Sequence, residues 1–152
     1  MILNHQRRVR VPIRILESFF ARVRRRLRLS SDALAIALVS DAQIARWNSS
    51  YRGKPRPTDV LSFPTAQSAL KPKRAGTFRA RDSSSSALYL GDIAIAPAVA
   101  RRNSRRFGRT FTQEMQILIL HGILHLMGYD HETDSGQMER YERRLRREFG
   151  LI

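Results

Sequence analysis

Three of the four histidines in this chain lie within the eleven-residue segment HGILHLMGYDH. His121 and His125 are four residues apart, so on a helix they project from one face, about one turn or ~6 Å apart along the axis. Both imidazoles can therefore point at one ion. Gly128 is expected to end that helix, which lets the chain turn back and bring His131 to the same ion. The spacing H-x3-H-x5-H thus predicts a metal site.

The ligand set favours zinc in an open, catalytic arrangement. Three neutral imidazole nitrogens leave the fourth position of a tetrahedral Zn²⁺ free for water, unlike the closed four-ligand sets of structural sites. Imidazole also suits nickel, copper and iron, but no redox ligand set accompanies these histidines. The chain has no cysteine, which excludes thiolate ligands and disulfides and is compatible with a reducing compartment. We expect one zinc ion, used in a hydrolytic reaction.

The residue after the first histidine argues against one kind of hydrolysis. Metzincin peptidases share this spacing in the motif H-E-x-x-H-x-x-G-x-x-H, where the glutamate is the general base. Here that position is Gly122, and no other carboxylate is placed by the sequence to replace it. Asp130 stands beside His131 and either orients an imidazole or shapes a turn; the sequence leaves both alternatives open.

Arginine dominates the charge of the chain. Lys and Arg total 28 against 13 Asp and Glu, a formal net charge of +15, and only three of the basic residues are lysines. A positive field of this size attracts polyanions, and the planar guanidinium fork suits phosphate oxygens. An arginine-rich genome with a solvated surface would give the same composition, but we favour nucleic-acid contact. No apolar run approaches the ~20 residues that span a bilayer, and no secretion signal opens the chain, so we expect a cytoplasmic protein without membrane contact.

Hydrophobic periodicity predicts the elements that would position the histidines. Apolar residues recur at three- and four-residue steps across 15–27, which indicates an amphipathic helix with a solvated basic face. The apolar stretch 115–127 predicts a buried central helix. Thr110 and Gln113 form its capping box, and Gly128 ends it.

Shorter segments complete the predicted architecture. Alternating or apolar runs predict strands at 2–13, 33–39, 58–63 and 87–95. Further helices are predicted at 40–47, 96–107 and 134–148, the last capped by Asp134 with Gln137. Glycine and two prolines make 51–57 a basic, turn-rich loop, and the polar, serine-rich segment 66–86 is expected to be a mobile loop. Strands and helices mixed without a βαβ repeat predict one α+β domain over 1–152, with a small mixed central sheet packed with helices and the zinc site at the end of the central helix.

Three segments together resemble the YbeY family of bacterial rRNA-maturation endoribonucleases. They are HGILHLMGYDHE, YRGKPRPTDVLSFP at 51–64 and LGDIAI at 90–95, in an order that extends over almost the whole chain. The resemblance implies an α+β fold, one zinc ion bound by the three histidines, and single-strand-specific endoribonuclease activity in 16S rRNA 3′-end maturation and ribosome quality control. The implied partners are the 16S rRNA precursor and the small ribosomal subunit, with its proteins or assembly GTPases.

The resemblance also singles out Arg52 as a catalytic residue, because the family's functionally important arginine follows the tyrosine of the second motif. The residue type agrees, since a cation on a loop shaped by glycine and proline is suited to clamp a phosphate. Several points stay open in the sequence. The nucleophile is either water or the RNA 2′-hydroxyl, and whether Asp59 or Asp92 reaches the site is undecided. The rival functions are a ribosome-assembly factor whose zinc is mainly structural and, less favoured, a zinc peptidase.

Overall fold

The computed structural model describes residues 1–65 and 89–152; the predicted loop 66–86 lies outside the described residues. Within the described residues, four strands form one sheet in the order β1-β2-β4-β3. Their bounds are β1 Ile2–Asn4, β2 Leu34–Leu38, β3 Val60–Pro64 and β4 Gly91–Ile95. β1 and β4 both run parallel to β2, whereas β3 runs antiparallel to β4. The predicted small mixed sheet is therefore confirmed.

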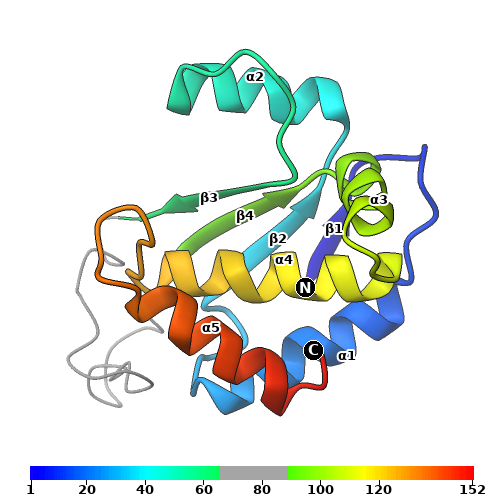
Figure 1. The fold of residues 1–152 in the computed structure, drawn as a ribbon. Helices are drawn as coiled ribbons and strands as arrows, with labels where there is room; N and C mark the ends of the chain where they lie inside the picture. The colour runs from blue at the N-terminus through cyan, green and yellow to red at the C-terminus, as the bar shows by residue number, and fades with distance from the viewer. Residues whose placement is uncertain (66–88) are drawn as a thin grey trace.

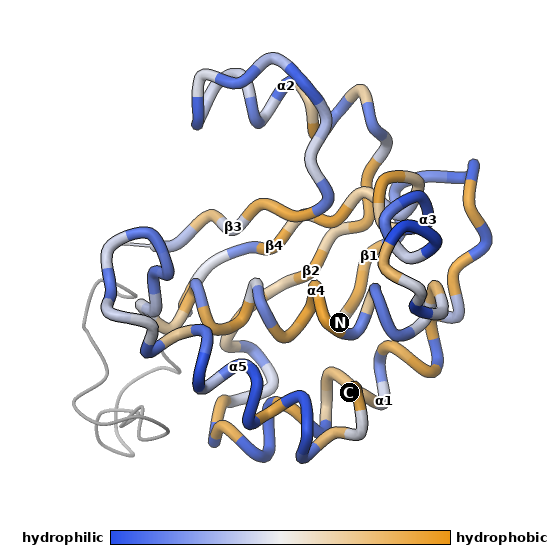
Figure 2. The backbone as a smooth tube through the Cα atoms, viewed as in Figure 1, coloured by the Kyte–Doolittle hydropathy of each residue, from blue (hydrophilic) through white to orange (hydrophobic). Residues whose placement is uncertain are grey.

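Five helices in the described part of the chain surround this sheet: α1 Ile13–Arg26, α2 Asp41–Arg52, α3 Pro97–Arg106, α4 Phe111–Leu126 and α5 Gln137–Glu148. Figure 1 shows α4 lying along one face of the sheet, with α1 and α5 beyond it and α2 on the opposite side. Figure 2 shows hydrophobic residues along the strands and α4, and mainly hydrophilic residues along α5. The α+β class predicted from the sequence is confirmed, with α4 as its central helix.

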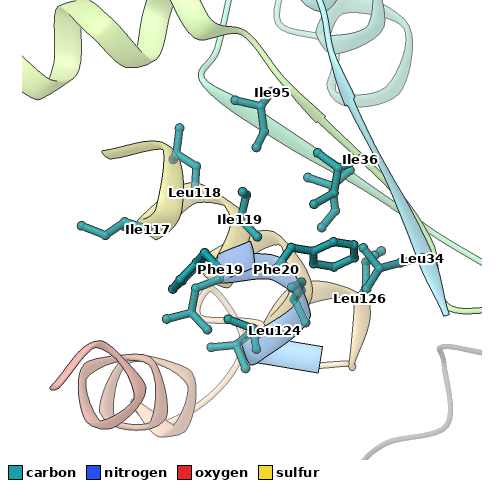
Figure 3. Close-up of a cluster of buried hydrophobic side chains, with 14 of the residues drawn as sticks. Phe19, Phe20, Leu34, Ile36, Ile95, Ile117, Leu118, Ile119, Leu124 and Leu126 are labelled. Atoms are coloured by element: carbon teal, nitrogen blue, oxygen red, sulfur yellow. The ribbon is translucent and has the colours of Figure 1, made fainter. Parts of the chain in front are cut away.

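The apolar character of α4 buries it between the sheet and the outer helices. In the close-up of Figure 3, Phe19 and Phe20 of α1 pack beside side chains of α4 and the sheet, among them Leu34, Ile36, Ile95, Ile119, Leu124 and Leu126. Burying an aliphatic or aromatic side chain of this size stabilises the fold by about 1.5–3 kcal/mol. The capping box at the start of α4 is present, since Thr110 Oγ1 accepts from Gln113 N–H and Gln113 Oε1 accepts from Thr110 N–H. The helix ends at Leu126, and Gly128 follows with a left-handed backbone (φ 99°), so both predicted ends of this helix hold.

A close contact fixes the height of α4 above the sheet. A Cβ atom added at Gly122 would lie 2.9 Å from two side-chain carbons of Ile93 on β4, closer than real Cβ atoms approach. The absence of a side chain at residue 122 therefore lets the helix rest directly on the sheet. The hydroxyl of Ser62 on β3 also donates to the Gly122 carbonyl at 3.3 Å. The half of α4 that carries the histidines is thereby held against β3 and β4.

The structure corrects the predicted loop 51–57. Tyr51 and Arg52 form the last turn of α2, which continues beyond the predicted end at Trp47. The helix ends at Gly53, whose backbone is left-handed (φ 65°) and whose N–H donates to the Ser49 carbonyl. A left-handed C-cap is favourable for glycine, so the turn begins there and the residues before it stay helical.

Several other predicted boundaries also move. The strand predicted over 2–13 ends at Asn4, and the strand predicted over 87–95 begins at Gly91. At Gly91, φ is +143° and a Cβ would overlap the Phe63 carbonyl oxygen, which explains why glycine opens β4. Asp134 does bond the start of α5, accepting from the N–H groups of Gly136 and Met138, but the N-cap position itself is Gly136. In the described part of the chain, no helix has the length and apolar character that crossing a membrane requires.

We expect Gly122→Ala to destabilise the protein although alanine is the better helix former. Overpacking against Ile93 costs about 1–3 kcal/mol, which exceeds the roughly 1 kcal/mol that alanine gains in helix propensity. Thermal unfolding followed by circular dichroism measures the change, with Gln116→Ala on the same helix as the control. A midpoint for Gly122→Ala at or above that of the unmodified protein would contradict the close contact.

Candidate metal centre

The end of α4 and the turn after it bring the three histidines together, as the sequence predicted. His121 and His125 lie one turn apart on α4, and the chain reverses at Gly128 (φ 99°) to return at His131. One ring nitrogen from each histidine lies within 4.8 Å of the other two. The Nε2 atoms of His121 and His125 are 3.1 Å apart. Three imidazole nitrogens thus converge on one point.

Asp130 shapes the turn between the second and third histidines. Its Oδ1 accepts from the Glu132 N–H at 3.0 Å, and its carbonyl accepts from the N–H groups of Thr133 and Asp134. Of the two roles left open by the sequence, the structure shows the turn role. This hydrogen-bonded turn sets where His131 leaves the backbone.

The carboxylate that orients an imidazole comes from α5. His121 Nδ1 lies 2.6 Å from Glu142 Oε1, and Arg146 Nη2 donates to Glu142 Oε2 at 2.8 Å. A carboxylate on Nδ1 favours the tautomer that places the proton there and the free lone pair on Nε2, which faces His125. Sequence reasoning missed Glu142. The available signal was its place next to Tyr141 on the buried face of α5.

The protonation states of the side chains around the three histidines suit the binding of a cation. Burial acts to raise the pKa of Glu142, but the hydrogen bond and charge of His121 and the charge of Arg146 outweigh it, so the pKa lies below its usual value. Burial, with the neighbouring His121 and His131, lowers the pKa of His125 to about 4. His125 is therefore neutral at neutral pH, the form that offers a lone pair to a metal.

These observations fit a bound metal ion. Of the residues that the structure describes, the three histidines form a group whose donor atoms are close enough to share one ion. The donor set is entirely imidazole, and one ring is fixed by a buried carboxylate. Both features are typical of transition-metal sites, and of zinc sites in particular.

The histidines form part of the wall of an open cleft of about 790 Å³. The other walls are β3, the turn after α4 and the last turn of α2. Arg52 lies in this cleft, and its Nη2 is 3.2 Å from Glu132 Oε1. The structure therefore brings the predicted arginine and the predicted metal ligands into one cleft, of a size that takes small molecules or a few nucleotides.

The two aspartates that the sequence left undecided differ in position. Asp59 lines the cleft, and its carboxylate accepts from Asn103 Nδ2 at 3.2 Å and Thr58 Oγ1 at 3.4 Å. Asp92 lies on β4 outside this cleft, where its carboxylate pairs with the Tyr89 hydroxyl. Asp59 therefore lines the cleft and Asp92 does not.

Comparison with known proteins places this site in a family. The profile of the family described as Endoribonuclease YbeY matches residues 2–150. The chain belongs to this family. The resemblance inferred from three short segments is thereby confirmed over nearly the full length of the sequence.

Three curated relatives in the family are 35–41% identical to this chain over the aligned residues. The Endoribonuclease YbeY of Solibacter usitatus is 40% identical over 114 residues, 75% of this chain and 64% of that protein. That of Rhodopseudomonas palustris is 41% identical over 120 residues, 78% of this chain and 57% of its own length. That of Sulfurovum sp. is 35% identical over 128 residues, 81% and 76% of the two chains. The match thus spans less than two thirds of the first two relatives' length.

A solved structure shows the same fold. The solution structure of TM1509 from Thermotoga maritima superposes with a TM-score of 0.58 and 26% sequence identity. The match covers 99% of this chain and 92% of the Thermotoga protein. The arrangement of helices around the mixed sheet is therefore shared across both chains.

We expect Glu142→Gln to weaken metal binding by roughly 10- to 100-fold, the usual effect of removing a carboxylate that orients a metal-bound histidine. Competition between the protein and a chromogenic zinc chelator measures the affinity. Glu139→Gln is the matched control, because Glu139 forms the same kind of i,i+4 ion pair with Arg143 on α5 but is exposed to solvent. Equal zinc affinities for both variants would show that Glu142 does not support the site.

Proposed function

We propose that this protein is a zinc-dependent endoribonuclease that cuts single-stranded RNA. The observation that carries the proposal is the convergence of three imidazoles and one guanidinium in a single open cleft. The family supports RNA as the substrate, since relatives in it are named endoribonucleases. The net charge of +15 favours a polyanionic ligand as well.

The residues of the cleft divide the work of phosphodiester cleavage. His121, His125 and His131 would hold the zinc ion, and Glu142 would keep His121 in the required tautomer. When bound, such an ion supplies Lewis-acid chemistry: it polarises a phosphoryl oxygen and acidifies water. Arg52 would bind a phosphate oxygen and offset the charge that builds on it in the transition state. We assign Arg52 the catalytic role on these grounds.

The position of Gly122 counts against the peptidase alternative. In metzincins the residue after the first histidine supplies the general base. Here residue 122 is glycine, and a Cβ on it would lie 2.9 Å from two side-chain carbons of Ile93 on β4. The chain therefore lacks the base of a metzincin at this position, and a larger residue there would require Ile93 to shift.

We further propose that the RNA is the 16S rRNA precursor and that the protein acts in the cytoplasm in 3′-end maturation and ribosome quality control. The small ribosomal subunit, with its proteins or assembly GTPases, would be the partner. This part follows from the likeness to bacterial rRNA-maturation enzymes that the three sequence segments carry. The non-enzymatic alternative, an assembly factor with a mainly structural zinc, makes the opposite prediction about turnover.

Cleavage of single-stranded RNA by zinc-loaded protein tests the proposal. We expect His121→Ala to abolish cleavage and Arg52→Ala to lower its rate by about 100-fold or more, as loss of a transition-state donor does. Arg25→Ala, an exposed arginine on α1, should cleave normally. A 3′-hydroxyl and 5′-phosphate at the new ends would indicate water as the nucleophile, and a 2′,3′-cyclic phosphate the 2′-hydroxyl.

The same residual cleavage in all of these preparations would point to a contaminating nuclease and would sink the enzymatic proposal. Unchanged binding of the variants to the small ribosomal subunit would then favour the assembly factor. Metal analysis of each preparation by mass spectrometry ties any loss of rate to loss of zinc. The comparison therefore separates the two functions directly.

We expect Glu132→Gln to tighten RNA binding by about 1.4- to 5-fold, since Glu132 competes with phosphate for Arg52 and such exposed pairs contribute only about 0.2–1 kcal/mol. The two side chains are 47% and 61% exposed, so a phosphate can reach the guanidinium. Fluorescence anisotropy with a labelled oligonucleotide measures the affinity. Glu139→Gln changes the net charge equally outside the cleft and should have less effect; equal gains would contradict a specific competition.

A further inference from the structure

An exposed aromatic side chain lies at the rim of the cleft that contains the three histidines, called the metal cleft below. Tyr51 has a large, mainly apolar side chain, yet it is 72% exposed. It lines the same cleft as the three histidines and precedes Arg52 in the last turn of α2. In Figure 1 this turn lies at the same end of the sheet as the tip of β3 and the turn after α4.

Two other aromatic rings hold Tyr51 in place. Its ring packs edge-to-face on Phe63 of β3, with the centroids 4.8 Å apart and the planes at 68°. Phe63 in turn packs edge-to-face on Trp47, one turn earlier on α2, at 5.7 Å and 84°. Phe63 therefore stands between two rings of α2 and supports Tyr51 from one side. The remaining surface of the Tyr51 ring is held out as a firm apolar platform.

The neighbouring charges indicate what the platform would bind. Arg52 offers its guanidinium to a phosphate in the same cleft, one residue from Tyr51. A nucleotide joins a phosphate to a flat base by a single sugar, so one nucleotide can reach two adjacent side chains of this kind. Aromatic side chains beside basic ones are the usual means of binding single-stranded nucleic acid, because every base has a face that stacks. A duplex keeps its bases stacked on one another and cannot offer them.

We propose that Tyr51, supported by Phe63, is a base-binding subsite that stacks on the base of the nucleotide whose phosphate Arg52 binds. The subsite makes the cleft selective for unpaired RNA and tolerant of base identity. This inference rests on the proposed RNA function and adds to it the side chain that distinguishes single-stranded from double-stranded RNA. Tyr51 positions the substrate and takes no part in bond breaking.

Anisotropy titrations of zinc-loaded protein with two labelled RNA oligonucleotides of equal length test the subsite. One carries all its bases and the other has abasic sites, so the phosphate charge is the same; electrophoresis confirms that both stay intact during the measurement. Stacking is lost in Tyr51→Ala and in Tyr51→Leu, and the leucine keeps an apolar contact to Phe63. We expect both variants to bind the complete oligonucleotide roughly 5- to 150-fold more weakly. Tyr51→Phe should bind within about twofold of the unmodified protein, since it keeps the ring.

The abasic oligonucleotide separates stacking from a general loss of fold or charge. It should bind equally to the unmodified protein and to the Tyr51 variants, because no base is present to stack. Phe107→Ala is the matched control, since Phe107 is 56% exposed beside Arg106 at the end of α3 and Arg109 in the turn after it, but lies outside the cleft. Equal losses on both oligonucleotides, or the same loss for Phe107→Ala, would overturn the subsite.

The outcome is independent of whether the protein cleaves RNA. Binding with the predicted pattern but without turnover would refute the enzymatic proposal and leave the subsite standing. Loss of turnover in Arg52→Ala together with unchanged binding in Tyr51→Leu would support the enzymatic proposal and refute the subsite. A second readout is the ratio of affinities for the complete single strand and its blunt duplex, which we expect to fall toward one in Tyr51→Ala.

Discussion

The position of the metal cleft depends on how closely α4 approaches the sheet. Gly122 allows that approach because a Cβ at this residue would collide with Ile93 of β4. The helix is otherwise surrounded by core side chains, so it has no freedom to move outward without opening cavities. Protein interiors are close-packed, so an added methyl group at residue 122 would displace α4. His121 and His125 would move with the helix. The hydrogen bond from Ser62 to the Gly122 carbonyl holds the same stretch to β3, the opposite wall of the cleft.

Around that fixed helix, three other segments supply the remaining functional groups. α5 brings Glu142 to the outer side of His121, and the turn closed by Asp130 returns His131 to the other two imidazoles. α2 contributes Tyr51 and Arg52 from across the cleft, anchored by the contact of its aromatic face with Phe63. Each group is held by packing or by a hydrogen bond that does not involve substrate. The cleft is therefore largely organised before a ligand binds, which lowers the entropic cost of binding.

The carboxylates around the cleft are also paired with other groups of the protein. The protein carries a net charge of +15, yet in the described part of the chain four carboxylates lie at or next to the cleft. Each is engaged: Glu142 with His121 and Arg146, Glu132 with Arg52, Asp59 with Asn103, and Asp130 with the Glu132 N–H. Glu142 is buried and stays ionised, so it offsets the positive charge that a metal brings. The exposed Glu132 is separable from its partner, since an ion pair in water is weak.

The sequence by itself determined the features that depend on neighbours in the chain. Helical periodicity and the glycine at residue 128 were enough to predict that His121, His125 and His131 converge, and the capping box predicted where α4 begins. Only the tertiary structure decided the rest. It brought Arg52 into the same cleft as the histidines and joined Glu142 to His121 across 21 residues of chain. Local conformational preference acts over about one helical turn, whereas contacts between distant segments depend on how closely the elements pack. In this protein the distance between α4 and the sheet is set by the contact of Gly122 with Ile93.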